Sequence, residues 1–366
     1  MEEINLNETL SYRILVGIQL YYTPALVTLG SLGNSLSVLV FFTTKLRKLS
    51  SSYYLSALAI SDTGFLLITF PSWLGMFDDV TWFNQPGFCE FSVYMTQVCS
   101  FLSVWFIVAF TVERFIAVRY PLKRPSMCTV SRAKAVLLCL SLFALISYTP
   151  YIFISGVSKQ NGSDIETCGP RRELMGIATT LNHVDVVFTL LIPFLAIVIL
   201  NALISRTVYK VARVRRSMTK SSGGGGSHKS RTSSSQTKVT EMLLVVSTVF
   251  ICLNLPSYVM RVWVYLSESL NLGEEQNINM IILQQYFQLL FLTNFGINFA
   301  LYCVSGQNFR KALISIFKPD LLRRAETTQI TVVSEYCRTA STRRTKTVNG
   351  SWRETHELVP INRPMN

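Results

Sequence analysis

The sequence predicts an all-α integral membrane protein, a bundle of seven transmembrane helices followed by a short amphipathic eighth helix. Of its 366 residues, 49% are hydrophobic and only 15% are charged, whereas ordinary soluble domains have roughly 25% charged residues. The charged residues concentrate between apolar stretches, each long enough for the ~20 residues that a membrane-spanning helix needs. These stretches cover about 18–43, 53–77, 89–121, 133–153, 181–209, 239–266 and 278–304.

The third stretch has no charged residue between Glu90 and Glu113. About 25 residues separate Cys89 from Arg114. At about 1.5 Å of rise per residue, this helix is roughly 36–38 Å long, more than the ~30 Å hydrocarbon core of a bilayer. Glu113 and Arg114 place a carboxylate beside a guanidinium at the membrane boundary, which permits an ion pair that can form and break. The alternative is an interfacial arginine that extends to water.

The loops between these stretches alternate in charge, and this pattern predicts the orientation of the chain. Lysine and arginine concentrate in 45–48, 119–134, 206–238 and 310–363, while acidic residues occupy the alternating loops. By the positive-inside rule the basic loops are cytoplasmic, so 1–17 is an extracellular N-terminus and 319–366 is a cytoplasmic tail. The net charge of +13 does not indicate nucleic-acid binding, because the basic residues lie between membrane spans.

The segments outside the 18–304 bundle each have a distinct composition. The third cytoplasmic loop, about 210–238, is basic and of low complexity, so we expect it to be flexible. Residues 305–318 place Phe309 and Leu313 on one face of an amphipathic helix that lies along the membrane. The tail is polar and is expected to be disordered. Sequons at Asn7 and Asn161 fall on the predicted extracellular side, where they can be glycosylated.

Two cysteines differ from the other six in their predicted location. Cys89 and Cys168 fall on predicted extracellular ends, where oxidation is permitted. We therefore expect a disulfide between them.

Several motifs resemble those of one receptor family. Glu113-Arg114-Phe115, followed by Tyr120-Pro121-Leu122, resembles the signature of rhodopsin-class (class A) G-protein-coupled receptors. Gly33-Asn34 and the stretch 58–62 resemble motifs of the family's first two helices. The resemblance covers about 15–320 and is strongest to the peptide branch. Residues 128–134 and 237–243 look like thyrotropin-releasing-hormone receptors, and 52–65 is similar to invertebrate neuropeptide receptors of the FMRFamide and CNMamide types.

This resemblance implies a function without covalent chemistry. A plasma-membrane receptor of this kind binds an extracellular neuropeptide and transmits the event to a heterotrimeric G protein by a conformational change. Arrestin and receptor kinases are the expected partners after activation, because serine and threonine beside basic residues in the third loop and tail are candidate phosphorylation sites.

The resemblance also implies two sites inside the bundle. Asp62 is the only carboxylate placed deep in a span, where it needs partners or a cation. With Asn34, Ser103, Asn294 and Asn298 it matches the family's polar cluster for an allosteric sodium ion, the one cofactor expected. A protonated, hydrogen-bonded Asp62 is the alternative. The activation and G-protein-coupling residues implied by the resemblance are Glu113, Arg114, Leu122 and Tyr302.

Some positions depart from the family pattern. Phe299 replaces a proline of the seventh helix, so the backbone there keeps its N–H and loses a built-in kink. Asn254 stands where the family usually has tryptophan, and Asn201 where it often has tyrosine. The switch therefore cannot be copied from better-known members.

Two sequence positions exclude aromatic amines and retinal as ligands. Thr96 stands where receptors for aromatic amines have an aspartate, and the seventh span lacks the lysine that retinal proteins need. The outer halves instead offer polar and aromatic side chains with both charge signs, which suit a short peptide. We expect Arg261 to bind an acceptor-rich group of that peptide. For each residue taken singly, helix packing or lipid headgroup contact is an equal alternative. The predicted ligand-binding residues are Gln97, His183, Asp185, Tyr258, Arg261, Tyr265, Gln285 and Gln288.

Three other classes of function make different demands on the sequence. A channel or transporter predicts inverted repeats and several intramembrane charges, and the sequence has neither. A receptor that signals only through arrestin remains an alternative, because Asn254 and Phe299 depart from the family pattern. An enzyme is disfavoured, because the three histidines provide no catalytic triad or metal-binding set.

Overall fold

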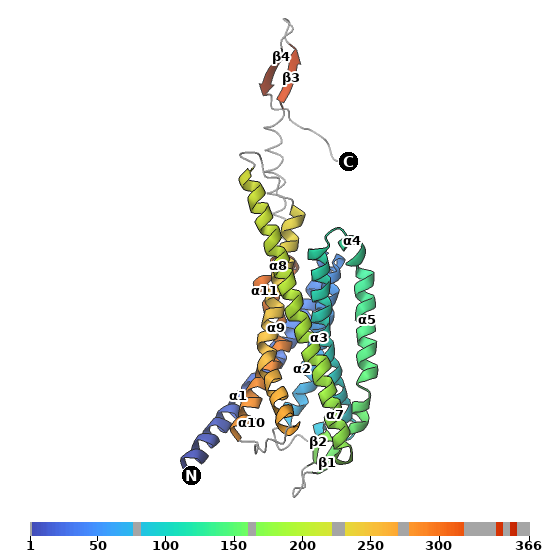
Figure 1. The fold of residues 1–366 in the computed structure, drawn as a ribbon, viewed down its shortest axis with the longest axis vertical. Helices are drawn as coiled ribbons and strands as arrows, with labels where there is room; N and C mark the ends of the chain where they lie inside the picture. The colour runs from blue at the N-terminus through green and yellow to red at the C-terminus, as the bar shows by residue number, and fades with distance from the viewer. Residues whose placement is uncertain are drawn as a thin grey trace. The chain divides into compact units, whose positions relative to one another are not determined.

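The computed structural model describes residues 2–75, 82–159, 166–221, 231–269, 278–317, 342–346 and 352–356. The chain forms two units, Met1–Arg310 and Lys311–Asn366. The first unit contains the helical bundle (Figure 1). Within the described residues, six helices are long and apolar enough to cross a membrane, and a bent pair makes a seventh crossing. The predicted all-α membrane bundle is therefore confirmed.

The helices of the bundle follow the predicted order. They are α1 (Glu2–Thr43), α2 (Ser50–Leu74), α3 (Phe88–Arg119), α4 (Arg124–Met127), α5 (Val130–Ser147), α6 (Pro150–Ile154), α7 (Met175–Asp185), α8 (Ile192–Ser221), α9 (Arg231–Ser269), α10 (Ile278–Gly296), α11 (Asn298–Ser305) and α12 (Gln307–Phe317). Strands β1 (Ser155–Lys159) and β2 (Glu166–Pro170) pair antiparallel in the loop between α6 and α7. A π-helical turn, Val186–Leu191, joins α7 to α8.

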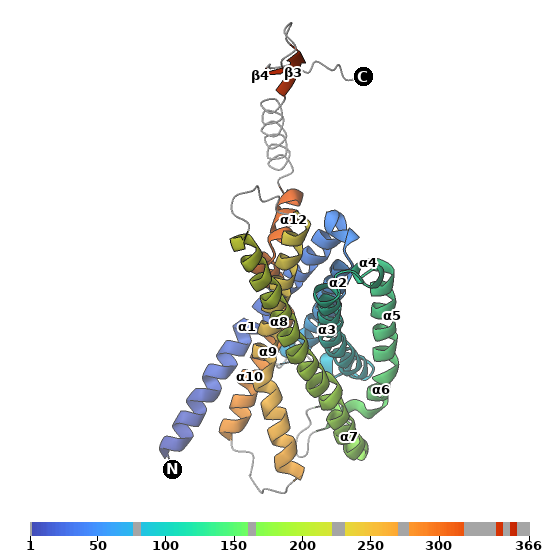
Figure 2. The same cartoon turned by 45° about the horizontal axis from the view of Figure 1, so that its top comes forward.

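The third span is the central helix of the bundle. In its most apolar window 61% of the residues are buried, against 17% for the span Val130–Ile154 at the periphery. Helix α3 contacts α2, α5 and α8, and Figure 2 shows it among them. Its buried side chains join a core cluster in which Phe106 and Ile107 pack with Phe250 of α9. A helix in this position can connect residues at the two ends of the bundle.

Two helices extend beyond their predicted spans. Helix α1 begins at Glu2 rather than at residue 18, and it runs away from the other helices toward its N-terminus (Figures 1 and 2). Helix α8 continues to Ser221 and α9 begins at Arg231, so most of the stretch 210–238 is helical. The structure therefore has helix at residues where the composition predicts a flexible loop. Alanine, arginine, lysine, methionine and glutamine favour helix, and extending an existing helix avoids the cost of nucleation.

The expected loss of the kink in the seventh span is also wrong. Helices α10 and α11 meet at an angle of 58°, although Phe299 stands in place of proline. The side chain of Asn34 donates from Nδ2 to the Phe295 carbonyl oxygen at 2.9 Å. A side chain inserted into the backbone ladder bends a helix as effectively as proline does.

The C-terminal unit contains one pair of strands. Within the tail 319–366, expected to be disordered, strands β3 (Thr342–Lys346) and β4 (Trp352–His356) pair antiparallel. Arg344 lies opposite Glu354 in this register. Threonine and tryptophan favour strands.

Candidate functional sites

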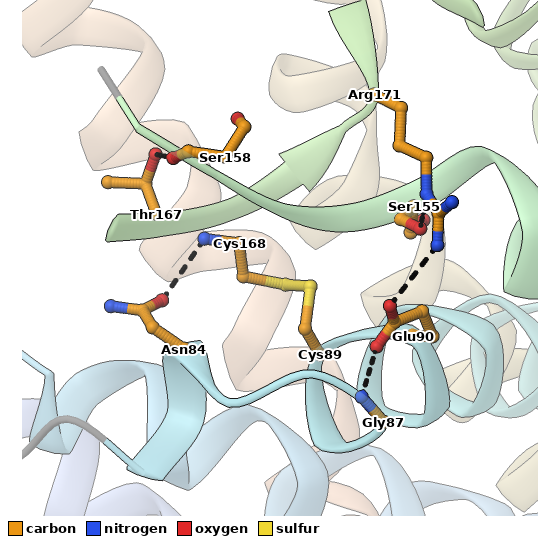
Figure 3. Close-up of a disulfide and its surroundings, with 9 residues drawn as sticks. All are labelled: Asn84, Gly87, Cys89, Glu90, Ser155, Ser158, Thr167, Cys168 and Arg171. Atoms are coloured by element: carbon orange, nitrogen blue, oxygen red, sulfur yellow. Dashed lines mark hydrogen bonds and ion pairs between the residues drawn. A yellow bond between two sulfur atoms is a disulfide. The ribbon is translucent and has the colours of Figure 1, made fainter. Parts of the chain in front are cut away.

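The end of the bundle at the start of α3, here called the disulfide end, is held by the predicted covalent link. Cys89 and Cys168 form a disulfide with a Cα–Cα distance of 5.6 Å. The Cys168 N–H donates to Asn84 Oδ1 at 3.1 Å, and Glu90 accepts the Gly87 N–H at 2.6 Å at the start of α3 (Figure 3). The β1–β2 hairpin is thereby fixed to the first turn of α3.

Inside this end, Asp185 is buried at the last position of α7. Its carboxylate accepts hydrogen bonds from the Tyr148 hydroxyl and, at 3.3 Å, from Thr189 Oγ1. The predictions did not include Tyr148 or Thr189. The available signal was their place along the chain, since Tyr148 ends the fourth span and Thr189 is one helical turn past Asp185.

Arg261 lies on α9 with its guanidinium 5.6 Å from the centre of the Phe291 ring. Among the described residues, no carboxylate lies within ion-pair distance of this guanidinium. The Tyr151 hydroxyl is buried and makes no hydrogen bond of ordinary geometry among those residues, although the Gln97 side chain lies close enough to interact with it. Among the described residues, the interior therefore combines a carboxylate, a guanidinium that contacts a ring and a phenol beside Gln97, which together can bind a polar ligand.

The other predicted ligand residues divide into three groups. Gln97, His183 and Gln288 are half-buried, and Tyr258 is buried in the core beside α10. Gln285 contacts α1, where it accepts a hydrogen bond from Gln19 Nε2 at 3.2 Å. The Tyr265 side chain and both sequons, Asn7 and Asn161, lie outside the side chains that the structure describes.

Several residues of the predicted polar cluster lie in hydrogen-bonding contact at mid-bundle. Asp62 is fully buried; Oδ1 accepts from Ser103 Oγ at 2.6 Å and Oδ2 from Asn298 Nδ2 at 2.7 Å. Asn294 contributes its carbonyl oxygen to Asn298 at 3.4 Å. Asn34 instead donates to α10, as described above, and its Oδ1 is buried without a partner in the part of the chain that the structure describes. A buried carboxylate, a hydroxyl and an unpaired amide oxygen are the hard oxygen donors that fit a sodium ion.

The opposite end of the bundle, here called the arginine end, contains the expected ion pair. Glu113 and Arg114 are both buried and paired to each other, so the alternative of an arginine extended to water is wrong. Ser50 Oγ donates to the same Glu113 oxygen at 3.0 Å, and the Arg114 guanidinium lies 5.7 Å from the centre of the Phe110 ring. Glu113 is therefore held from α2 as well as by its neighbour.

The other two residues predicted for this end are Tyr302 and Leu122, and they lie in different surroundings. Tyr302 is fully buried and packs against Phe41 and Phe309 at centroid distances of 5.7 and 5.5 Å. Its hydroxyl has no hydrogen-bond partner among the described residues. Leu122 is 96% exposed.

Cys128 lies beside Glu113 outside the membrane spans. Its thiol donates to the Glu113 carbonyl oxygen at 3.7 Å. Burial raises the pKa of the Cys128 thiol, and the Glu113 carboxylate raises this pKa further.

The two unusual asparagines make contacts between and within helices. Asn201 Nδ2 on α8 donates to Ser247 Oγ on α9 at 2.7 Å. Asn254 is fully buried and donates to the Phe250 carbonyl oxygen at 2.7 Å. Each leaves its side-chain oxygen buried without a partner in the described part of the chain.

Comparison with known proteins adds a family match and several relatives. The family profile "7 transmembrane receptor (rhodopsin family)" matches residues 33–302. Growth hormone secretagogue receptor type 1 of Oryctolagus cuniculus is 27% identical over 315 residues, covering 83% of this chain and 82% of that protein. The galanin-like G-protein coupled receptor of Caenorhabditis elegans is 25% identical over 328 residues, covering 85% and 76%. The FMRFamide receptor of Drosophila melanogaster is 27% identical over 321 residues, covering 80% of this chain and 54% of that protein.

Proposed function

The chain belongs to the rhodopsin family of seven-transmembrane receptors, and on that premise we propose that it is a multi-pass receptor of the plasma membrane for a neuropeptide. Its N-terminus is extracellular and its C-terminus cytoplasmic in this proposal, and it carries out no covalent step. Relatives named for FMRFamide and as galanin-like support a peptide ligand.

The observation that carries the proposal is the separation of charges at the disulfide end. Asp185 and Arg261 lie on different helices, and the guanidinium contacts a ring rather than a carboxylate. A guanidinium offers five donors in a planar fork. A peptide carries both amide donors and acceptors, so it can use the guanidinium, the carboxylate and the Tyr151 hydroxyl together.

The arginine end supports coupling to a heterotrimeric G protein. Peptide binding shifts the balance between two arrangements of the bundle, and this requires different ligand affinity for each. In the signalling arrangement Arg114 leaves Glu113, and α8 and α9 separate with loss of the Asn201 bond to Ser247. A groove with an apolar Leu122 and a basic rim, including the exposed Arg213, fits a partner helix with an apolar face and an acidic end.

Two further parts of the proposal concern regulation. A sodium ion held by Asp62 and Ser103, with an oxygen of Asn34, would favour the arrangement in which these oxygens converge. Receptor kinases would add phosphate to serine and threonine of the tail, and arrestin would bind the added charge.

A peptide screen tests the proposal. Cells carrying the full chain and a promiscuous Gα are exposed to a neuropeptide library, and calcium is recorded. Arg261→Gln and Asp185→Asn should shift the response to higher peptide concentration, while Val259→Ala, at an exposed position of the same helix, should not. Arg114→Ala should be silent.

The same screen distinguishes the second candidate, a receptor that signals only through arrestin. Asn254 favours this candidate, because it replaces the usual tryptophan and has an unpaired buried oxygen. Arrestin recruitment without a calcium or cyclic-AMP response would support it. A calcium response unaffected by both Arg261→Gln and Asp185→Asn would contradict the proposed peptide site.

A further inference from the structure

A groove of about 660 Å³ lies between α1 and α2 toward the disulfide end. It is lined by Pro24, Ala25, Thr28 and Leu32 of α1 and by Leu67 and Phe70 of α2. Both helices are membrane spans, so the groove opens into the hydrocarbon of the bilayer. Its volume falls within the ~300–1,000 Å³ typical of small-molecule sites.

Most hydroxyl groups in the wall of this groove already donate to the backbone of their own helix. Thr28 Oγ1 donates to backbone carbonyls of its own helix, including Ala25 at 3.3 Å. Thr63 and Ser35 do the same to Ala59 and Ser31, at 2.8 and 2.7 Å. The remaining lining hydroxyl, that of Ser31, is buried and has no hydrogen-bond partner among the described residues. The other lining side chains are apolar, so a chain of methylenes matches most of the wall, and a sterol hydroxyl would find only hydroxyl oxygens as partners.

We propose that this groove binds an acyl chain of a bilayer phospholipid, and that the bound chain stabilises the neighbouring mouth of the ligand site. The second part rests on the proposed function, because it concerns a residue assigned to peptide binding.

A continuous set of contacts leads from the groove to that mouth. The Phe70 ring, in the groove wall, stacks on Trp73 with centroids 5.2 Å apart and planes at 18°. Trp73 Nε1 donates to the Gln19 carbonyl oxygen at 3.2 Å. The Gln19 side chain donates to Gln285 on α10, as described above. An acyl chain that holds Phe70 therefore restrains α1, α2 and α10 together.

Photo-crosslinking tests occupancy. The purified full chain is incubated with phosphatidylcholine carrying a photoactivatable group in one acyl chain, and adducts are mapped by mass spectrometry. We expect adducts at residues 24–35 and 63–70 that unlabelled phosphatidylcholine removes and cholesterol does not. Ala25→Phe should abolish them. Leu29→Phe, at a position of α1 that is 71% exposed but outside the groove, should retain them.

Several outcomes would overturn the acyl-chain site. Adducts spread evenly over the exposed faces of α1 and α2 would mean that lipid only surrounds the bundle. Competition by cholesterol alone would mean a sterol site. Adducts that persist in Ala25→Phe would also refute the proposal. If Ala25→Phe does not fold, Thr28→Phe blocks the same groove and replaces it.

Hydrogen exchange tests the coupling. Adding phosphatidylcholine should slow amide exchange in 10–23 of α1 and 279–288 of α10 in the wild type. Phe70→Ala should keep the cross-links and lose this slowing. Equal slowing in Phe70→Ala would refute the path through Trp73. Neither the cross-linking nor the hydrogen-exchange measurement uses a receptor ligand. A negative result in either one is therefore distinct from a negative result in the peptide screen.

Discussion

Replacing Gly30 with alanine should force α1 away from α10. A β-carbon added at Gly30 would lie 2.8 Å from the Gly296 Cα and 2.9 Å from Leu66 Cδ1. The leucine methyl can rotate, but the backbone carbon cannot, so the two helices must separate. Gly17, in the same helix, provides the matched control, because a β-carbon there meets no atom within 4 Å.

The size of the effect follows from two opposing contributions. Alanine favours helix over glycine by about 1 kcal/mol, and this gain is common to both variants. Overpacking costs about 1–3 kcal/mol, and only Gly30→Ala incurs it. The free energy of unfolding of Gly30→Ala should therefore lie about 1–3 kcal/mol below that of Gly17→Ala, a difference of about 5–150-fold in the unfolding equilibrium.

Thermal unfolding in detergent measures this difference. A thiol-reactive dye reports exposure of the Cys99 thiol, which is free and buried in the folded chain. Gly17→Ala should unfold at or above the wild-type temperature, and Gly30→Ala below it. Equal stability of the two variants would show that α1 and α10 do not approach as closely as described.

Three further predictions concern single contacts. Trp105→Phe removes the hydrogen bond from Nε1 to the Phe188 carbonyl oxygen at 3.0 Å, in the π-helical turn. This change should lower the free energy of unfolding by about 0.5–1.5 kcal/mol, and an unchanged melting temperature would contradict it. Because its pKa is raised, Cys128 should be alkylated more slowly than a free cysteine at pH 8 and should gain rate as pH rises further, and Glu113→Gln should accelerate the reaction. Asn201→Leu removes the bond between α8 and α9, worth about 1 kcal/mol, and should raise signalling without ligand in a calcium assay; unchanged basal signalling would show that this bond does not hold the resting arrangement.

The sequence predicts most accurately those features that depend on composition or on a fixed motif. Seven apolar stretches give seven crossings because the bilayer accepts only helices with their backbone groups paired. Asp62, Ser103 and Asn298 come from three different spans, and no periodicity places them together. Their convergence was predicted only through the motifs that the chain shares with its family.

Other features depend on contacts that no motif encodes. Tyr148 was missed as a partner of Asp185, because the two residues are 37 positions apart and only tertiary packing brings the hydroxyl to the carboxylate. Thr189 is one helical turn past Asp185, so its bond is local, but no motif marks it. The sequence does not decide whether Arg114 is buried, because an arginine that extends to water and an arginine paired with Glu113 have the same sequence. Tertiary packing decides between them, and it decides for the pair because Ser50 brings a second donor to the carboxylate.

The seventh span shows how packing can replace a missing proline. Phe299 lacks the ring that would break the backbone ladder, yet the bend persists because Asn34 bonds the Phe295 carbonyl and Gly30 meets Gly296 closely. The aromatic side chain is used elsewhere, since Phe299 covers Gly33, where an added β-carbon would lie 2.9 Å from it. It also meets the Phe309 ring at a centroid distance of 5.9 Å.

The presence of Phe299 in place of proline changes which side chains must move at the arginine end. Tyr302 is enclosed by Phe41 and Phe309, and Phe309 is in turn held by Phe299. For the Tyr302 hydroxyl to approach Arg114, these edge-to-face ring contacts have to rearrange together, because each ring supports the next. A well-packed aromatic cluster has discrete arrangements rather than a continuous range. The replacement of proline by phenylalanine therefore leaves the bend in place and transfers control of Tyr302 from the backbone to the side chains around it.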